Sequence, residues 1–271
     1  MTPQRNAPIG VFDSGLGGLS VWRELDAMIP AEDALYIADS AYVPYGTRSP
    51  EEIRGRSIAV TQFLIDRGVK LGVVACNTAS AIAIDDLRAT FPEMKFVGLE
   101  PAVKPAVGMS LTGRVGVLAT PRTVSGDRLR VLIEHWADGV QVHSIAANGM
   151  VELVESGVLL GEQVDTVLSP ILDPLLEQQV DVIVLGCTHY PFLRDAIEAY
   201  TGPGVRVIDS GEAIARRTMN LLQADRMLHE RGVLGSLNMF TTGDAEGASR
   251  VASKLLGREL EVLPADVQAR Q

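Results

Sequence analysis

The sequence has few cysteines and no apolar segment long enough to cross a membrane. Cys76 and Cys187 are the only cysteines among 271 residues, and they lie 111 positions apart (187 − 76). Two cysteines do not make a disulfide framework, so we expect reduced thiols. The longest apolar runs have the length of core strands, and the first residues lack the apolar region of a secretory signal. We therefore expect a cytoplasmic protein with no membrane partner.

Basic residues are fewer than acidic residues. The chain has 24 Lys and Arg against 34 Asp and Glu, which gives a net charge of −10. Such a surface repels phosphate backbones, so we expect no nucleic-acid partner. An anionic ligand must then be held locally, by backbone N–H groups and helix ends. No Arg or Lys lies within the polar segments 13–15, 76–78 and 187–189, which predicts carboxylate binding without an arginine clamp.

Short apolar runs alternate with longer amphipathic stretches. Apolar residues make up 46% and charged residues 21% of the chain, the balance of a globular protein with a sizeable core. Ser49, Pro50 and Glu52 form a helix-start signal. Apolar strands separated by helices predict an α/β fold with mainly parallel sheets covered on both faces. The expected strands are 9–12, 34–38, 72–75, 95–99, 115–118, 140–144, 182–185 and 205–208.

The two halves of the chain resemble each other weakly. I-G-V-F-D-S-G pairs with V-G-V-L-A-T-P, G-V-V-A-C-N-T with I-V-L-G-C-T-H, and F-V-G-L-E-P-A with V-R-V-I-D-S-G. Ile9 precedes Cys76 by 67 residues (76 − 9), and Val115 precedes Cys187 by 72 (187 − 115). The pattern predicts two pseudo-symmetric α/β units that bring both cysteines to one interdomain cleft. A chance match of strand patterns stays open.

Each cysteine follows an apolar run that is read as a buried strand. Helix-like sequence follows Cys76, so we expect this thiol at the carboxyl end of a strand, where parallel sheets bind ligands. The N–H groups and partial positive charge of a helix start would lower its pKa. Cys187 repeats the arrangement, and Pro191 suits an early helix position. His189, two residues after Cys187, could hold a proton, orient a substrate or lower the thiol pKa.

Several interpretations of the cysteines are open. Free cysteines are often small core residues. A zinc site lacks ligands, because Cys76, Cys187 and His189 make three at most. A redox disulfide would remove both thiols from acid/base chemistry. If the thiols face opposite sides of one carbon, one removes the α-proton and the other delivers a proton, which inverts the centre without a metal or pyridoxal cofactor.

Two further polar loops follow expected strands. Asp13 and Ser14 could hold an ammonium group or steer the nearby thiol, or they could form a simple turn. The glycines after them do not complete a dinucleotide loop, because Ser20 stands where the last glycine is required. A second loop carries Tyr45 and Gly46 and could close over a small ligand. An ordinary Pro/Gly turn is the alternative.

Taken together, these segments resemble the glutamate racemases of bacterial wall synthesis, within the aspartate/glutamate racemase superfamily. The matching motifs are F-D-S-G-L-G-G-L-S-V, A-D-S with P-Y-G, A-C-N-T-A-S, L-A-T-P-R-T-V, L-G-C-T-H-Y-P and F-T-T-G-D. The resemblance implies cofactor-independent interconversion of L- and D-glutamate, which supplies D-glutamate for peptidoglycan. It implies two domains, residues 1–99 plus 210–271 and residues 100–209, with the active site between them. A homodimer is an assembly that the resemblance allows.

The resemblance also implies roles for individual residues. Cys76 matches the base for D-glutamate and Cys187 the base for L-glutamate, with Asp13 and His189 assisting the thiols. Glu155 in L-V-E-S-G matches a family glutamate. The positions that match substrate contacts are Asp13, Ser14, Tyr45, Gly46, Asn77, Thr78, Thr188 and His189.

The sequence departs from the family pattern in two places. The family often reads A-C-P before the glutamate, where this chain has Ala147-Asn148-Gly149, and the family often has a tyrosine after T-P-R-T-V, where this chain has S-G-D-R-L. An aspartate racemase, hydantoin racemase or decarboxylase on the same scaffold is one alternative. A non-catalytic periplasmic-type binding protein, which also has two α/β lobes, is another.

Overall fold

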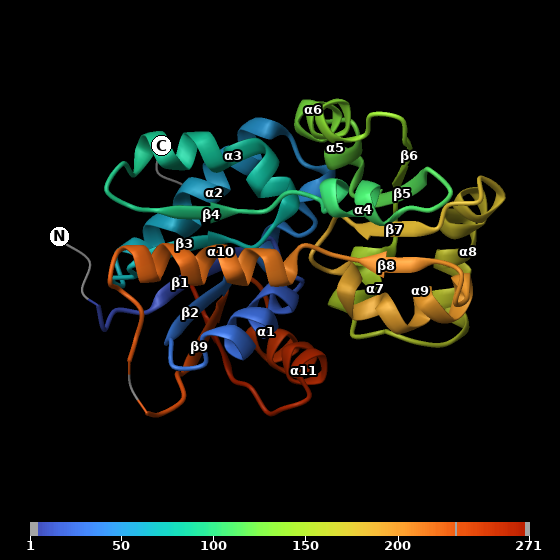
Figure 1. The fold of residues 1–271 in the computed structure, drawn as a ribbon. Helices are drawn as coiled ribbons and strands as arrows, with labels where there is room; N and C mark the ends of the chain where they lie inside the picture. The colour runs from blue at the N-terminus through green and yellow to red at the C-terminus, as the bar shows by residue number, and fades with distance from the viewer. Residues whose placement is uncertain (1–4, 231, 269–271) are drawn as a thin grey trace.

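The computed structural model describes residues 5–230 and 232–268, and it contains two sheets that are each flanked by helices (Figure 1). The first sheet has the strand order β10-β9-β2-β1-β3-β4 and the second the order β6-β5-β7-β8. Every recorded strand pairing is parallel. The strands are β1 Ile9–Asp13, β2 Ala34–Ala38, β3 Leu71–Val74, β4 Phe96–Gly98, β5 Arg114–Ala119, β6 Gln141–Ala146, β7 Val182–Leu185, β8 Arg206–Ile208, β9 Leu237–Thr241 and β10 Val262–Pro264. The predicted α/β class is confirmed.

The strand order confirms the internal repeat. In the first sheet β2-β1-β3-β4 lie side by side, and in the second β6-β5-β7-β8 follow the same order. The three pairs of segments matched by sequence are therefore β1 with β5, β3 with β7 and β4 with β8. Only β9 and β10, which extend the first sheet at the β2 edge, were not predicted as strands. β9 is half-exposed and β10 has three residues, so neither shows the apolar run on which the prediction depended.

Helices cover both faces of the first sheet. They are α1 Leu19–Met28, α2 Pro50–Ile65, α3 Asn77–Thr90, α10 Gly211–Ala224 and α11 Ala245–Leu256. Successive side chains of a strand point to opposite faces. Val11 of β1 accordingly packs in one core with Leu25 of α1, and the next residue, Phe12, packs in another with Val60 of α2. Complete burial of one such leucine contributes about 1.5–3 kcal/mol.

The second sheet is covered in the same way. Its helices are α4 Val103–Met109, α5 Pro121–Val124, α6 Asp127–Trp136, α7 Met150–Glu155, α8 Glu162–Glu177 and α9 Arg194–Thr201. Leu118 packs with Leu172 of α8 in a core that continues into the first unit. Val117 packs with Leu129 of α6 on the opposite face. The two units therefore share one continuous core on one face of the sheets, and each has a separate core on the opposite face.

The start of α2 agrees with the sequence signal. Ser49 is the N-cap residue, and its side chain accepts a hydrogen bond from the backbone N–H of Glu52 at 3.2 Å. Pro50 occupies the first helical position, where its missing N–H is not needed. The predicted helix start is confirmed.

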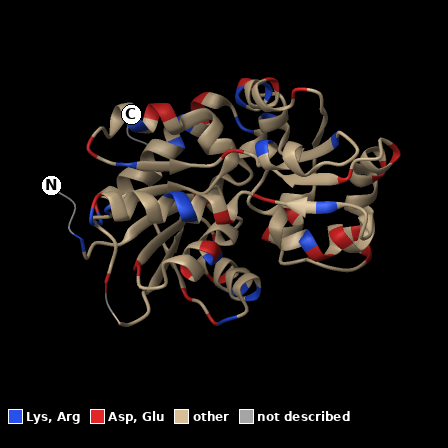
Figure 2. Cartoon of the chain, viewed as in Figure 1, with Lys and Arg blue, Asp and Glu red and all other residues tan. Residues whose placement is uncertain are grey.

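The chain passes from the first sheet to the second between β4 and β5 and returns after β8. We propose two domains on this basis, residues 1–99 plus 210–271 and residues 100–209; the ends 1–4 and 269–271 lie outside the described residues. Figure 2 shows charged residues of both signs interspersed on the helices of both units. Among the described residues, no helix has the length and apolar composition needed to cross a membrane.

Candidate active site

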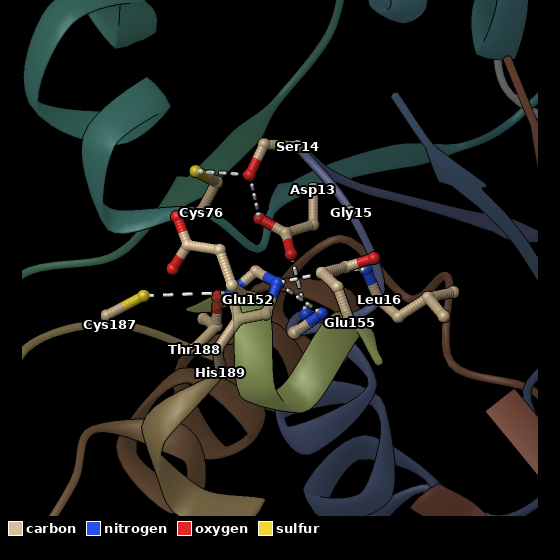
Figure 3. Close-up of polar contacts among 12 residues, drawn as sticks. Asp13, Ser14, Gly15, Leu16, Cys76, Glu152, Glu155, Cys187, Thr188 and His189 are labelled. Carbon is tan, nitrogen blue, oxygen red and sulfur yellow. Dashed lines mark hydrogen bonds and ion pairs between the residues drawn. The ribbon is translucent and has the colours of Figure 1, made fainter. Parts of the chain in front are cut away.

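Both cysteines lie just beyond the carboxyl end of a strand. Cys76 follows β3 and is the N-cap residue of α3, and Cys187 follows β7. Asp13 is the last residue of β1, the strand next to β3. Figure 3 shows the two thiols facing a common space from the two units. They are close enough for the charge of Cys187 to affect the pKa of Cys76.

Cys76 is buried beside a carboxylate. Its Sγ lies 3.8 Å from the Ser14 Oγ and accepts the Ala79 N–H at 3.5 Å. The Ser14 Oγ lies 3.4 Å from Asp13 Oδ1, and the Gly18 N–H donates to Asp13 Oδ2 at 2.8 Å. Burial first, and the Asp13 charge second, raise the pKa of Cys76 well above its ordinary value, whereas the Ala79 N–H lowers it. The expected lowering of this pKa by the helix start is therefore wrong, because desolvation outweighs the effect of the Ala79 N–H.

Asp13 is suited to exchange a proton with this thiol. It is completely buried, and burial raises its pKa, while the charge of His189 and the Gly18 N–H act in the opposite direction. A hydrogen bond between Asp13 and Cys76 also contributes to both pKa values. A carboxylate with a raised pKa is a stronger base than an exposed one. Asp13 can therefore take the thiol proton when a bound substrate needs a thiolate.

Cys187 is paired with an imidazole instead. Its Sγ lies 3.7 Å from His189 Nδ1, and His189 Nε2 lies 2.6 Å from Glu155 Oε1. The same Glu155 oxygen accepts the Leu16 N–H at 2.6 Å, across the junction of the two units. Burial lowers the pKa of His189, but hydrogen bonds to Cys187 and Glu155 outweigh it and raise this pKa well above 6.5. His189 Nδ1 therefore faces Cys187, while Nε2 lies between Glu155 Oε1 and the Gly17 N–H, which is 3.2 Å away.

The surroundings of the two cysteines differ in one respect that the repeat did not predict. Cys76 is the cap of a regular helix, whereas a turn and the 3-10 helix η3 (Tyr190–Leu193) separate Cys187 from α9. Pro191 lies at the start of η3, and α9 begins only at Arg194. The prediction that a helix begins directly after Cys187 is wrong, whereas the early helix position predicted for Pro191 is confirmed.

The other predicted substrate-contacting residues gather around the thiols. Asn77 is 5% exposed, and its amide Nδ2 has no hydrogen-bond partner in the described part of the chain. A buried donor without a partner calls for an explanation, and a ligand oxygen would provide it. Thr78 and Thr188 are buried as well, and the backbone O of Thr188 accepts the Ser20 hydroxyl at 2.7 Å.

The Tyr45 hydroxyl is bonded to a carboxylate of its own unit. It donates to Asp39 Oδ2 at 2.6 Å, and burial together with the Asp39 charge raises the pKa of Tyr45 well above 10. The neighbouring Gly46 contacts the second unit, since a Cβ added there would lie 2.7 Å from Thr120 Cβ. The backbone at Gly46 therefore lies close to the second unit.

Three residues near the site had no role assigned from sequence. Thr120 Oγ1 lies 3.0 Å from Thr78 Oγ1, and Thr123 Oγ1 lies 3.1 Å from Thr120 Oγ1. Thr120 and Thr123 both belong to the T-P-R-T-V motif, which could have indicated their place near the site. Glu152 is exposed and lies one helical turn before Glu155, so both project from one face of α7; in the view of Figure 3 its carboxylate lies between the thiols.

Both cysteines are free thiols, and the described residues contain no group of three or more His, Cys, Asp or Glu side chains placed to hold a metal ion. Residues 9–218 match the Asp/Glu/Hydantoin racemase family. The chain belongs to this family. The match spans all the site residues named above and confirms the resemblance seen in the motifs.

Individual racemases are similar over almost the whole chain. The glutamate racemase of Herpetosiphon aurantiacus is 49% identical over 240 residues, which cover 89% of this chain and 94% of that protein. The Francisella tularensis glutamate racemase in complex with D-glutamate superposes with a TM-score of 0.86 at 28% identity, covering 98% of this chain and 100% of that one. The Escherichia coli glutamate racemase in complex with L-glutamate and the activator UDP-MurNAc-Ala gives 0.83 at 35% identity, covering 95% and 97%.

Proposed function

We propose that this racemase-family chain interconverts L- and D-glutamate by moving the α-proton between two thiols, with no cofactor. The observation that carries the proposal is the pair of buried thiols supplied by the two repeated units at one location. The similarity to glutamate racemases over nearly the whole chain supports glutamate as the substrate. In this role the protein supplies D-glutamate for peptidoglycan synthesis.

The two thiols take opposite roles in the two directions. With D-glutamate bound, Cys76 gives its proton to Asp13 and removes the α-proton, and Cys187 delivers a proton to the other face. With L-glutamate bound, Cys187 removes the α-proton while the His189 imidazolium stabilises its thiolate, and Cys76 delivers. Proton transfer requires each sulfur within hydrogen-bond reach of its face of the carbon. Glu155 assists by holding the His189 ring and its charge.

We assign substrate binding to short polar groups and backbone N–H donors. Asn77 Nδ2 is a free buried donor, and Ser14, Thr78 and Thr188 supply hydroxyls around the thiols. Such groups reach a carboxylate without the bidentate geometry of arginine. A substrate-bound structure with an arginine fork on either carboxylate would contradict this assignment.

The decisive experiment follows α-hydrogen exchange in heavy water. Protein treated with chelator and spectroscopically free of pyridoxal phosphate is given L-glutamate, D-glutamate, L-aspartate or D-aspartate. We expect both glutamate enantiomers to exchange their α-hydrogen and to interconvert. Exchange of aspartate alone would assign the chain to another branch of the family, and a strict need for metal or pyridoxal would refute the two-thiol mechanism.

A double cysteine variant distinguishes the proposed enzyme from a non-catalytic binding protein with two similar lobes. Replacement of both cysteines by serine should abolish exchange while D-glutamate still binds. Unchanged function of that double variant would support the binding protein. We also propose a homodimer in the cytoplasm, and sedimentation of the purified chain measures its assembly.

A further inference from the structure

Asp39 is a buried acceptor just outside the site. It directly follows β2, and its backbone N–H donates to the Asp13 carbonyl at 2.9 Å. Its side chain is completely buried and accepts four hydrogen bonds: two from Arg56 at 2.8 and 3.0 Å, one from the Tyr45 hydroxyl at 2.6 Å and one from the Thr242 hydroxyl at 2.8 Å. No proposed step of the reaction uses this carboxylate.

Arg56 connects Asp39 to three other parts of the chain. It lies in α2, and its side chain is 5% exposed. Its third nitrogen donates to the Val267 carbonyl at 2.9 Å, beyond β10. Its guanidinium lies 4.0 Å from the centre of the Tyr42 ring, within the loop between β2 and α2. The Asp39–Arg56 pair therefore contacts this loop at two places: Asp39 directly precedes it, and Arg56 packs on Tyr42 within it.

The later part of this loop, residues 40–48, lies against the second unit. Gly46 lies directly against Thr120, and the Arg122 side chain donates to the Arg48 carbonyl at 2.9 Å. Thr120 in turn bonds to Thr78, two residues after Cys76. The loop thus joins the two units beside the thiols, and its own anchor is the Asp39–Arg56 pair.

We propose that Asp39 and Arg56 are positioning residues, which fix the 40–48 loop so that Gly46 closes on Thr120 over bound substrate. The proposal rests on the function proposed above. Asp39 makes four bonds from one carboxylate, and removing its charge leaves the buried Arg56 guanidinium without its partner. The loop then loses the contact that fixes the Tyr45 ring. The site would still contain both thiols and their partners, but it would close less often.

The variants Asp39→Asn and Arg56→Lys test this positioning role. Asp39→Asn removes the charged partner of the buried Arg56 guanidinium, so we expect its KM for both glutamate enantiomers to rise by about tenfold or more. kcat should change by less than about threefold, because the acid/base groups are untouched. Arg56→Lys keeps the positive charge for Asp39, so it gives a folded protein with a milder KM increase if Asp39→Asn folds poorly.

The matched control is Glu32→Gln. Glu32 forms a further buried ion pair of this unit, with Lys70 Nζ at 2.6 Å, and both side chains are at most 1% exposed. Lys70 also bonds to the carbonyls of Arg5 and Met227, away from the thiols. We expect Glu32→Gln to lower the Tm as the Asp39 variant does, while KM stays within about twofold of wild type.

Backbone hydrogen exchange measures the loop itself, whatever the enzyme turns over. We expect amides in residues 40–48 to exchange about tenfold faster in the Asp39 and Arg56 variants and unchanged in Glu32→Gln. Unchanged exchange and KM in the first two would overturn the proposal, as would an equal KM rise in the control. If the wild type fails to turn over glutamate, the proposed function falls, and the exchange result still decides the positioning role.

Discussion

Cys76 and Cys187 come from different units, so we expect each to serve one enantiomer as base. Cys76→Ser or Cys187→Ser should lower racemisation roughly 100-fold or more in both directions, since the hydroxyl is a far weaker acid and base than the thiol. Elimination from a glutamate analogue with a β leaving group needs only one base. The Cys76 variant should still eliminate from the L analogue and the Cys187 variant from the D analogue.

The measurement gives both variants both enantiomers of the analogue and follows elimination. The variant with both cysteines replaced is the control and should eliminate from neither. Equal loss with both enantiomers in both single variants would show that the thiols do not each serve one face, and the two-base mechanism would have to be abandoned.

Glu155→Gln should change the pH dependence on the Cys187 side. Hydrogen bonds to Cys187 and Glu155 raise the pKa of His189 above 6.5, so the stability that its imidazolium contributes is fully present below pH 6.5 and is lost as the pH rises through the raised value. Loss of the Glu155 charge lowers this pKa. We expect the alkaline limb of kcat/KM for L-glutamate to move to lower pH, with a smaller change for D-glutamate. A limb that stays in place would mean that Glu155 does not support His189.

Sequence reasoning found most of these residues, but it did not predict their protonation. Asp13 and both cysteines stand at strand ends, where motif and topology agree, and His189 lies two residues after Cys187. The pKa of Cys76 was mispredicted because a sequence shows the helix start but not the burial or the distance to Asp13. The partner of the Tyr45 hydroxyl, Asp39, was not predicted either, because the tertiary fold determines it.

At the scale of elements, the loop after β1 needs glycine because it packs against the other unit. A Cβ added at Gly17 would lie 2.2 Å from His189 Nδ1. We expect Gly17→Ala to displace the imidazole from Cys187 and to lower kcat/KM by roughly 100-fold, as misplaced catalytic groups do. Steady-state kinetics with both enantiomers measure the loss.

Gly55→Ala is the matched control for this substitution. Gly55 lies inside α2, and an added Cβ there has no atom within 4 Å. We expect normal kinetics and a free energy of unfolding raised by about 0.5–1 kcal/mol, because alanine is the better helix former. Normal kinetics in Gly17→Ala as well would show that this loop does not set the position of His189.

Most strands were predictable because their signals are local. The apolar runs gave eight of the strands, and Ser49 with Pro50 gave the start of α2. β9 and β10 depend on pairing with β2 and with each other, which no local pattern shows. The turn after Cys187 is also a tertiary feature, since its course follows from the contact between His189 and Glu155.

At the scale of the whole molecule, the repeat predicted two units, and their contacts came only from the structure. The thiols are 5% and 6% exposed, so we expect the units to separate when substrate enters. One of the links between them is the ion pair of Arg128 on α6 with Asp85 on α3. Both side chains are more than a third exposed, and a surface pair of this kind contributes about 0.2–1 kcal/mol.

Opening of the molecule can be measured with its own two cysteines as probes. We expect Arg128→Ala to speed thiol labelling of both Cys76 and Cys187 by up to about fivefold, because the open state gains the small energy of the lost pair. Saturating D-glutamate should slow both labelling rates. Arg130→Ala is the control, since Arg130 pairs only with Asp127 and Glu134 of its own helix among the ion pairs recorded for the described residues. Equal labelling rates in the Arg128 and Arg130 variants would mean that the thiols are reached without separation of the units at α6. Faster labelling of only one cysteine in the Arg128 variant would also contradict a common opening, because both thiols face the same space.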